Sequence, residues 1–405
     1  MRTTLARPLA VVSLVSGLLA PIDPAGAAER IPAFARRYRV SCNLCHNPVP
    51  VLTAFGEAFA GNGFRVTPKE LPTDTVNTGD ELLWLLKEVP LALRLDAYIN
   101  TYGNGNTGTD LQTPYNIKLL SGGTISRSLS YYLYFFLFER GEVGGIEDAF
   151  IYVNDLGGLP LDVAVGQFQV SDPMFKRELR LEYQDYAVYR ARVGDQPADL
   201  TYDRGVMAMA DLAGFTLTGI VVNGNGRVAA GATRRLDDNL PKNFMGHLTR
   251  DLASGVRLGA MGYRGQQEGA AGAGPVVTNT VWMLGADASL ERGPLLLNAQ
   301  YLHREDDRPT FTVGEPTAVT DGGFAELLFR PARSRWYGVA LYNRVTSTRP
   351  LLDVRLGGPG GVAKYETLTG GGGYQLRRNF RVYGELTRDL EATTLLWTLG
   401  VTTAF

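Results

Sequence analysis

From about residue 88 to the C-terminus, apolar and polar residues alternate in short segments. In residues 91–102, LALRLDAYINTY, one face carries aliphatic side chains and the other carries Arg94, Asp96, Tyr98 and Asn100. A period of two residues is typical of β-strands. Strands with one apolar and one polar face, joined by loops rich in Gly, Pro, Asn and Asp, predict a transmembrane β-barrel with a polar lumen. At roughly 20 residues per strand and connection, residues 88–405 predict about 16 antiparallel strands, with about 14 to 18 allowed.

The C-terminal stretch supports a barrel. Its sequence, TTLLWTLGVTTAF, alternates in the same way and ends on Phe405. A terminal aromatic strand resembles the recognition signal of bacterial outer-membrane barrels. A soluble β-sandwich or propeller with a buried final strand is the alternative. The predicted fold is therefore an all-β transmembrane barrel with a small N-terminal α-helical segment, located in the outer membrane of a Gram-negative-type cell.

The first 27 residues have the three zones of a secretory signal peptide. Arg2 and Arg7 are followed by the apolar stretch PLAVVSLVSGLLA, and Ala25 and Ala27 flank Gly26 at an expected cleavage site. We therefore expect an exported chain that starts near residue 28. Export permits disulfides, but the chain has only 2 cysteines, so a disulfide scaffold is not expected.

Both cysteines lie in one motif, Cys42-Asn43-Leu44-Cys45-His46. This C-x-x-C-H spacing is that of c-type haem attachment, in which each thiol forms a thioether with a haem vinyl group and the histidine is an axial iron ligand. A zinc site would need a second ligand pair, and a thioredoxin-like pair would need a βαβ context. A Cys42–Cys45 disulfide would be strained. The prediction is one covalent haem c, bound by Cys42, Cys45 and His46.

The flanking residues fit a small cytochrome segment over residues 28–87, between the signal peptide (1–27) and the barrel (88–405). Leu52, Phe55, Ala58 and Phe59 recur at helical spacing, and glycines at 61 and 63 predict the end of that helix. The stretch TGDELLWLLKEV, residues 78–89, predicts a second helix.

The second axial ligand of the haem must come from elsewhere. Between residues 28 and 173, the chain has no methionine and, apart from His46, no histidine. The second ligand could instead be Lys69, Lys87 or the α-amine that signal-peptide cleavage creates. The sixth coordination position of the iron could also be empty. The later candidates are Met174, Met207, Met209, Met245, His247, Met261, Met283 and His303.

Met174 is the preferred candidate because of the segment that carries it. Residues 171–190, SDPMFKRELRLEYQDYAVYR, break the strand alternation. After an early porin strand, such a segment either folds into the lumen or forms a plain extracellular loop. An inward fold would carry Met174 into the lumen, where it is the candidate distal ligand of the haem iron.

These features together resemble a known family. The signal peptide, the stretch IPAFARRYRVSCNLCHNPVPVLTAFGEAFAGNGFRV and the barrel ending in phenylalanine resemble fused outer-membrane monohaem cytochrome–porins, whose known members are iron oxidases. The specific likeness covers residues 31–65 and implies that Cys42, Cys45 and His46 hold the haem. Residues 47–50, Asn-Pro-Val-Pro, differ from the more aromatic, histidine-bearing stretch of the iron oxidases. The resemblance thus implies electron transfer, with Fe(II) as one of several candidate substrates.

The functional prediction is an electron-transfer protein or an iron-oxidase-like oxidoreductase. It would exchange electrons between an extracellular donor or acceptor and a periplasmic c-type cytochrome or other carrier, in contact with outer-membrane lipid. One alternative is a transport porin whose haem segment is a plug or sensor. Another is a soluble periplasmic enzyme with a substrate-binding β-domain. A net charge of −1 gives no electrostatic reason to expect nucleic-acid binding.

Overall fold

The computed structural model describes residues 33–66, 75–83, 85–103, 108–354 and 360–405. The predicted signal peptide lies outside the described residues. Within the described ranges, no helix is long and apolar enough to cross a bilayer.

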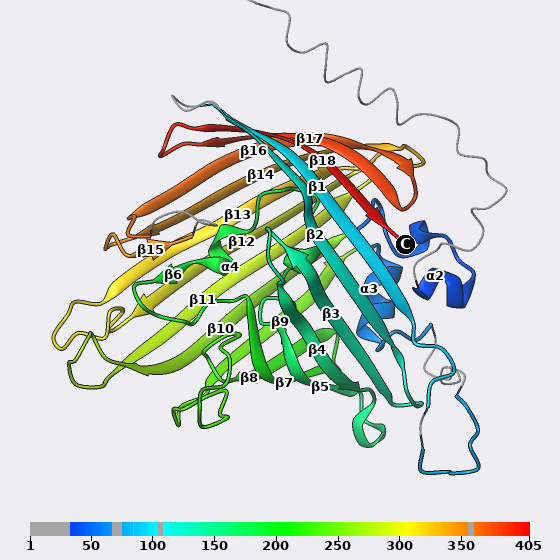
Figure 1. Cartoon of the computed structure of the whole chain (residues 1–405), viewed down its shortest axis with the longest axis horizontal. Coiled ribbons are helices and arrows are strands. Elements are labelled where there is room, and N and C mark those ends of the chain that lie inside the picture. Colours follow the sequence, from blue (N-terminus) through cyan, green and yellow to red (C-terminus); the bar gives the residue numbers. More distant parts are fainter. Residues whose placement is uncertain (1–32, 67–74, 84, 104–107, 355–359) are drawn as a thin grey trace, which may run out of the picture.

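Sixteen antiparallel strands form a closed barrel (Figure 1). Each strand pairs with its neighbours along the chain, and β1 closes the barrel by pairing with β18. The strands are β1 (Leu91–Gly103), β2 (Gly108–Thr124), β3 (Leu129–Glu139), β4 (Gly145–Val153), β5 (Leu161–Gln169), β7 (Tyr202–Leu212), β8 (Phe215–Val222), β9 (Asn243–Ala253), β10 (Val256–Gly269), β11 (Val277–Arg292), β12 (Leu295–Asp306), β13 (Ala318–Phe329), β14 (Trp336–Ser347), β16 (Lys364–Arg377), β17 (Phe380–Asp389) and β18 (Leu395–Ala404). The predicted strand number is confirmed.

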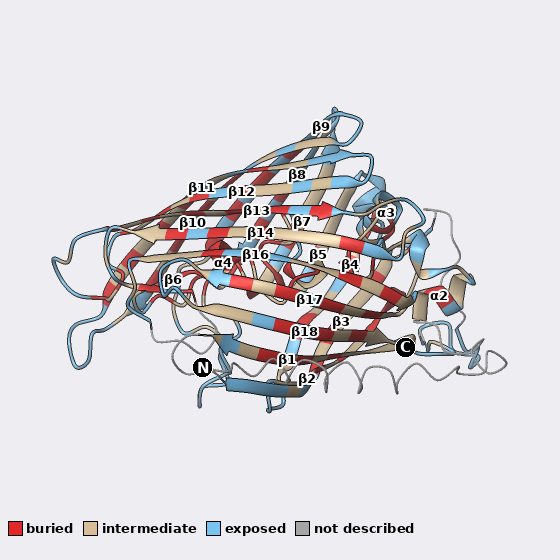
Figure 2. Ribbon diagram, turned by 90° about the horizontal axis from the view of Figure 1, so that it is seen from above, coloured by how far each residue is buried: buried red, intermediate tan, exposed pale blue. Residues whose placement is uncertain are grey.

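The barrel buries its polar faces and exposes its apolar faces. On β1, Asp96 and Asn100 are fully buried, whereas the aliphatic residues between them face outward. On β18, Trp397 and Leu399 are exposed, and Thr398 between them is buried. Figure 2 shows this alternation of buried and more exposed residues along the strands. An exposed apolar outer surface of this kind is suited to lipid.

The two ends of the barrel differ in the length of their connections. The chain passes from β7 to β8, from β9 to β10 and from β11 to β12 through two residues each, and this end also holds the C-terminus. A slightly longer turn there contains the helix η4 (Leu156–Gly158). Longer connections, including residues 223–242, lie at the other end. In bacterial barrels, short turns are periplasmic and longer loops extracellular.

The connection between β5 and β7 folds into the barrel, and we call residues 170–201 the lumen loop. It contains η5 (Arg177–Leu179), α4 (Ala187–Arg190) and β6 (Arg192–Val193), and β6 pairs with β15 (Leu352–Asp353). Leu181, Tyr189 and Leu200 of this loop are at most 1 % exposed. Of the two alternatives for residues 171–190, an inward fold and an extracellular loop, the structure shows the inward fold.

The N-terminal segment lies at the short-turn end of the barrel, near the C-terminus (Figure 1). It contains α2 (Ala33–Tyr38), η3 (Cys42–Leu44) and α3 (Ala54–Gly61). The helix predicted from the spacing of Leu52 to Phe59 is α3, and Asn62 caps its end before Gly63, whose φ is 61°.

The second predicted helix, over residues 78–89, is wrong. The described residues there form turns and an isolated bridge between Thr75 and Leu86. The Asp80 carboxylate accepts a hydrogen bond from the Leu82 amide at 2.9 Å, and Leu82 is 94 % exposed. A local side-chain bond of this kind competes with a helix, which gains little when its leucines have no core to pack against.

Candidate functional site

The C-x-x-C-H motif forms one tight helical turn. Ser41 caps it, and the amides of Cys45 and His46 both donate to the Cys42 carbonyl, at 3.2 and 2.8 Å. Both thiols are free and partly exposed. Burial raises the pKa of each thiol above its usual value, so both are protonated near neutral pH.

The His46 ring is oriented by a backbone carbonyl. Nδ1 of His46 lies 2.9 Å from the Pro50 carbonyl oxygen. Because this oxygen can only accept, Nδ1 carries the proton and Nε2 keeps its lone pair. Burial lowers the pKa of His46, so the ring is neutral near neutral pH. A neutral imidazole held through Nδ1 is the form that ligates a metal through Nε2.

Helix α3 is packed directly against the turn. Thr53 caps the helix through the Gly56 amide and donates its hydroxyl proton to the Leu44 carbonyl at 2.7 Å. A Cβ at Gly56 would lie 2.3 Å from the Cys45 carbonyl oxygen, which explains the need for glycine at this close approach. The two thiols and the imidazole are thus held on a rigid backbone.

This donor set fits a c-type haem. The chain places two thiols on one turn beside a neutral imidazole that is hydrogen-bonded through Nδ1, and these are the residue types that covalent attachment and axial ligation require. Among the described residues, no cluster of three or more His, Cys, Asp or Glu could hold a bare metal ion.

The N-terminal segment is anchored to the barrel by a buried arginine. Arg65 is 3 % exposed and donates to the Arg127 carbonyl at 2.9 Å and to the Asp155 carboxylate at 3.3 Å. Tyr152 of β4 donates to the Gly61 carbonyl at 2.9 Å. A Cβ at Gly63 would lie 2.4 Å from the Ser130 hydroxyl of β3, so the segment meets the wall closely.

Aromatic side chains fill the space between this segment and the wall. Phe34 of α2 stacks on Phe64 at 5.2 Å between ring centroids and meets Phe59 of α3 edge-on at 5.1 Å. Phe64 in turn stacks on Tyr132 of β3 at 5.4 Å. On another side, Arg330 of the β13–β14 turn donates to the Asn47 carbonyl at 2.9 Å. The segment is therefore held by wall elements on different sides of the barrel end.

The lumen loop meets the N-terminal segment inside the barrel. Val51, directly after the histidine-orienting Pro50, packs in one buried cluster with Leu181 of the loop. The wall residues of this cluster are Tyr98, Leu328, Tyr337 and Tyr383. The site thus continues from the C-x-x-C-H turn into the filled lumen.

The loop also bonds to strands on opposite sides of the barrel. Its contacts with wall side chains run from Glu178 to Lys118 of β2 and Tyr134 of β3, from Tyr189 to Gln300 of β12, from Tyr186 to Glu326 of β13, from Ala187 to Asn343 of β14 and from Tyr183 to Glu385 of β17. Within the loop, Arg177, Arg180 and Arg190 surround the Asp185 carboxylate. A loop bonded this widely crosses the lumen rather than lining one side.

Met174 lies in the lumen loop with its side chain 3 % exposed, inside the main apolar cluster. Arg257, at the short-turn end of β10, donates to the Pro173 and Met174 carbonyls at 3.1 and 3.4 Å. Burial raises the pKa of Glu57 on α3, and Arg257 is the first charge that opposes this effect. Arg257 thus contacts the Met174 stretch and also acts electrostatically on Glu57 of α3. Ligation of the haem iron by Met174 stays a prediction.

The other candidate axial ligands of the haem iron lie on the barrel strands, where the methionines pack with apolar residues and the histidines pair with carboxylates. Met207, Met245, Met261 and Met283 pack in the same apolar cluster as Met174. His247 pairs with Asp287 at 2.8 Å and is buried. His303 pairs with Asp321 at 2.8 Å and contacts the Trp282 ring.

Sequence reasoning missed the residues that support the site. Pro50, Gly56, Arg65 and Tyr152 carry no motif of their own, and their roles depend on contacts between distant parts of the chain. The Thr53 cap and the helix that follows it were the only local signals near them.

The comparisons with known proteins concern the barrel. No protein-family model and no curated protein matches the sequence. Among solved structures, the chain is similar to an anion-selective porin from Comamonas acidovorans (TM-score 0.56, 14% identity, 78% of this chain and 99% of that chain covered). It is also similar to Salmonella typhi OmpF in complex with daunomycin (TM-score 0.54, 12% identity, 78% and 97% covered) and to a loop-deletion mutant of OmpT from Vibrio cholerae (TM-score 0.54, 11% identity, 78% and 99% covered).

Identities this low indicate a common fold and nothing more. The fold is that of outer-membrane porins, so the predicted outer-membrane barrel is confirmed. The porin part of the resemblance to cytochrome–porins is borne out, whereas the cytochrome part and the haem stay predictions.

Proposed function

We propose that this protein transfers electrons across the outer membrane by means of one haem c held at the short-turn end of the barrel. Cys42 and Cys45 would attach the haem, and Nε2 of His46 would ligate its iron. When bound, the haem supplies a one-electron Fe(III)/Fe(II) couple. A periplasmic c-type cytochrome or other carrier would dock at the short-turn end, and an extracellular donor or acceptor, with Fe(II) as one candidate, would approach from the long-loop end.

The observation that carries this proposal is the hydrogen bond from His46 Nδ1 to the Pro50 carbonyl, in the same turn as both thiols. This bond leaves the unprotonated Nε2 as the nitrogen that would ligate the haem iron. The chain orients the imidazole, holds the two unpaired thiols partly exposed, and packs α3 behind them.

The filled lumen argues against a water-filled pore, and so against the transport alternative. Tyr189, Phe168 and Leu181 are 0 to 1 % exposed although they lie within the barrel. Apolar packing at this density excludes water. A filled lumen of this kind blocks hydrated solutes.

The first experiment is a redox-titrated optical spectrum of the full-length protein, exported with its haem-attachment machinery and purified in detergent. We expect a c-type spectrum that survives denaturation, because the attachment is covalent. Rapid reduction by Fe(II) would support an iron substrate. Reduction only by strong artificial donors would be consistent with the electron-transfer proposal but would exclude Fe(II) as the substrate.

The matched variants are Cys42→Ser, Cys45→Ser and the double variant. We expect the double variant to lose covalent haem while its barrel still migrates as a folded species on unheated gels. Wild-type protein without covalent haem would overturn the proposal.

Transport is the second candidate, because the fold is that of porins and one similar structure is an anion-selective porin. In that case, the N-terminal segment and lumen loop would act as a movable plug. Planar-bilayer recordings separate the two functions. We expect no steady conductance from the wild type, whereas open-channel steps of porin size in the wild type would favour transport.

A further inference from the structure

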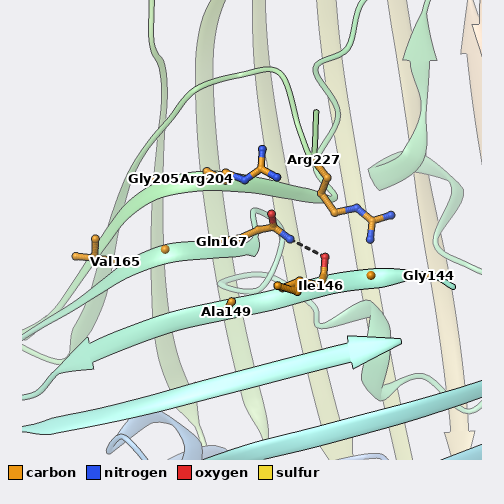
Figure 3. Close-up of a pocket in the computed structure, with 10 residues that line it drawn as sticks. Gly144, Ile146, Ala149, Val165, Gln167, Arg204, Gly205 and Arg227 are labelled. Carbon is orange, nitrogen blue, oxygen red and sulfur yellow. Dashed lines mark hydrogen bonds between the residues drawn. The ribbon is translucent and has the colours of Figure 1, made fainter. Parts of the chain in front are cut away.

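A second site lies on the outer wall, far from the C-x-x-C-H turn. A pocket of about 800 Å³ opens where the pairing of β4 with β5 ends (Figure 3). The last paired residues are Ala149 and Gln167. Beyond them, Gln167 donates through Nε2 to the Ile146 and Glu147 carbonyls, both at 2.8 Å, and so closes the wall behind the pocket.

The pocket faces the membrane side of the wall. Val165 and Ile146 in its lining are 50 and 45 % exposed, whereas Ala164 and Phe168 on the opposite face of β5 are buried in the lumen. Ile146 and Arg204 lie near the long-loop ends of β4 and β7, and Val165 lies at the middle of β5. The pocket therefore lies at the outer rim, at the boundary between the apolar belt and the extracellular loops.

Two arginines line the loop side of this pocket. Arg204 belongs to β7, and Arg227 comes from the connection between β8 and β9 (Figure 3). Arg204 donates to the Val228 carbonyl at 2.8 Å, and Arg227 pairs with Glu147 at 2.6 Å and lies over the Tyr202 ring. These contacts fix both guanidinium groups but use a minority of their five N–H donors each. Two cations and one carboxylate leave the pocket with net positive charge.

We propose that this pocket binds a phosphate group of an outer-leaflet lipid. Arginine forks match phosphate geometry, and the bond is charge-assisted. The apolar part, formed by Ile146, Ala149 and Val165, lies on the membrane side, where the first carbons of an acyl chain would pack. The arrangement of cations above an apolar surface at the bilayer boundary is that of lipid headgroup sites. A soluble anion would use the arginines but not the apolar part.

The test measures lipid binding to the full-length protein in mixed micelles by native mass spectrometry. The probes are diphosphoryl lipid A, its dephosphorylated form and inorganic phosphate. We expect saturable binding of the phosphorylated lipid and at least tenfold weaker binding of the dephosphorylated form. Arg204→Gln should weaken binding about fivefold, because one surface arginine contributes on that order near a phosphate.

Arg264→Gln is the matched control, since Arg264 also lies on the long-loop half of a wall strand but does not line the pocket. It should leave the affinity unchanged. Ala149→Phe fills the apolar part and keeps both arginines, so it should also weaken lipid binding. This variant tests the pocket without disturbing the Arg227–Glu147 pair.

Equal affinity of the wild type, Arg204→Gln and Ala149→Phe would overturn the proposal. Full displacement of lipid by inorganic phosphate at equal concentration would also overturn it, because the pocket would then be a site for free anions. None of these outcomes depends on haem, so the electron-transfer proposal is tested separately.

Discussion

At the scale of single residues, the C-x-x-C-H turn depends on neighbours that have no chemistry of their own. Pro50 orients the His46 ring through a carbonyl, and Gly56 allows α3 to touch the Cys45 backbone. The fixed imidazole and the close helix are properties of the backbone path. Small changes at these positions should therefore act on the site without removing a ligand.

Gly56→Ala is expected to push α3 away from the turn, because its Cβ would lie 2.3 Å from the Cys45 carbonyl oxygen. We expect a cost of about 1–3 kcal/mol from overpacking and a lower yield of covalent haem. Gly61→Ala is the control, since nothing lies within 4 Å of its Cβ. Haem content per barrel and hydrogen exchange of residues 33–66 are the measurements. Equal results for the two variants would contradict this account of Gly56.

Met174→Ala tests the proposed distal ligand. Met261→Ala is the matched control, because both methionines are 3 to 4 % exposed in the same cluster. Each change should destabilise the protein by about 2–5 kcal/mol. Only Met174→Ala should shift the haem spectrum and lower the reduction potential. An unchanged low-spin spectrum in that variant would remove Met174 as the ligand.

At the scale of elements, the lumen loop fills the interior of the barrel, which would otherwise be an open channel. Its backbone and side chains bond to β2, β3, β12, β13, β14 and β17. The Asp185 carboxylate organises the loop by binding Arg177, which is 5 % exposed, together with Arg180 and Arg190. Because the loop bonds to six strands of the wall, it is part of the core of the protein.

Asp185→Asn is expected to loosen this loop, because three arginines would lose their carboxylate in a buried setting. The expected cost is about 3–5 kcal/mol, the usual penalty of breaking one partner of a buried ion pair. In planar bilayers, the variant should show transient conductance that the wild type lacks. Asp307→Asn, on an exposed loop, should behave as the wild type. If the Asp185→Asn variant shows no conductance and unchanged hydrogen exchange in residues 170–201, then Asp185 does not hold the lumen loop in place.

At the scale of the whole molecule, the apolar and polar faces of the barrel are reversed relative to those of a soluble protein. The barrel's outer wall is apolar, its lumen is lined by polar residues, and the N-terminal segment and lumen loop meet at Val51 and Leu181. The barrel closes through β1 and β18, where Leu93 and Phe405 exchange backbone hydrogen bonds at 2.7 and 2.8 Å. Lipid contact and strand closure together stabilise the wall around the site.

Leu399→Arg tests the orientation of the wall. Leu399 lies near the middle of β18 and is 41 % exposed on the outer face. An arginine there should cost about 2–4 kcal/mol in lipid vesicles, because a charge near the bilayer centre is poorly solvated. Leu390→Arg, in the loop between β17 and β18, should cost less than about 1 kcal/mol. The measurement is the free energy of unfolding in urea, and equal costs would contradict a lipid-facing Leu399.

Part of this site was predictable, because it depends on local spacing. C-x-x-C-H predicts haem attachment within five residues, and the apolar spacing after it predicts α3. Residues 78–89 have similar spacing but no helix, because a helical pattern requires a surface on which to pack. Arg65 and Tyr152 were not predictable, since each acts through contacts with residues far away in the chain.

The sequence by itself determined the barrel, its approximate strand number and the C-x-x-C-H motif, because a two-residue period and a five-residue motif are local properties. Only the tertiary structure decided that residues 170–201 cross the lumen, that His46 is oriented by Pro50 and that Arg204 and Arg227 meet at one pocket. Those arrangements depend on which distant segments share the limited space inside and around a closed sheet. Packing and hydrogen bonding between distant segments determine which of them occupies that space. A local sequence pattern does not contain this information.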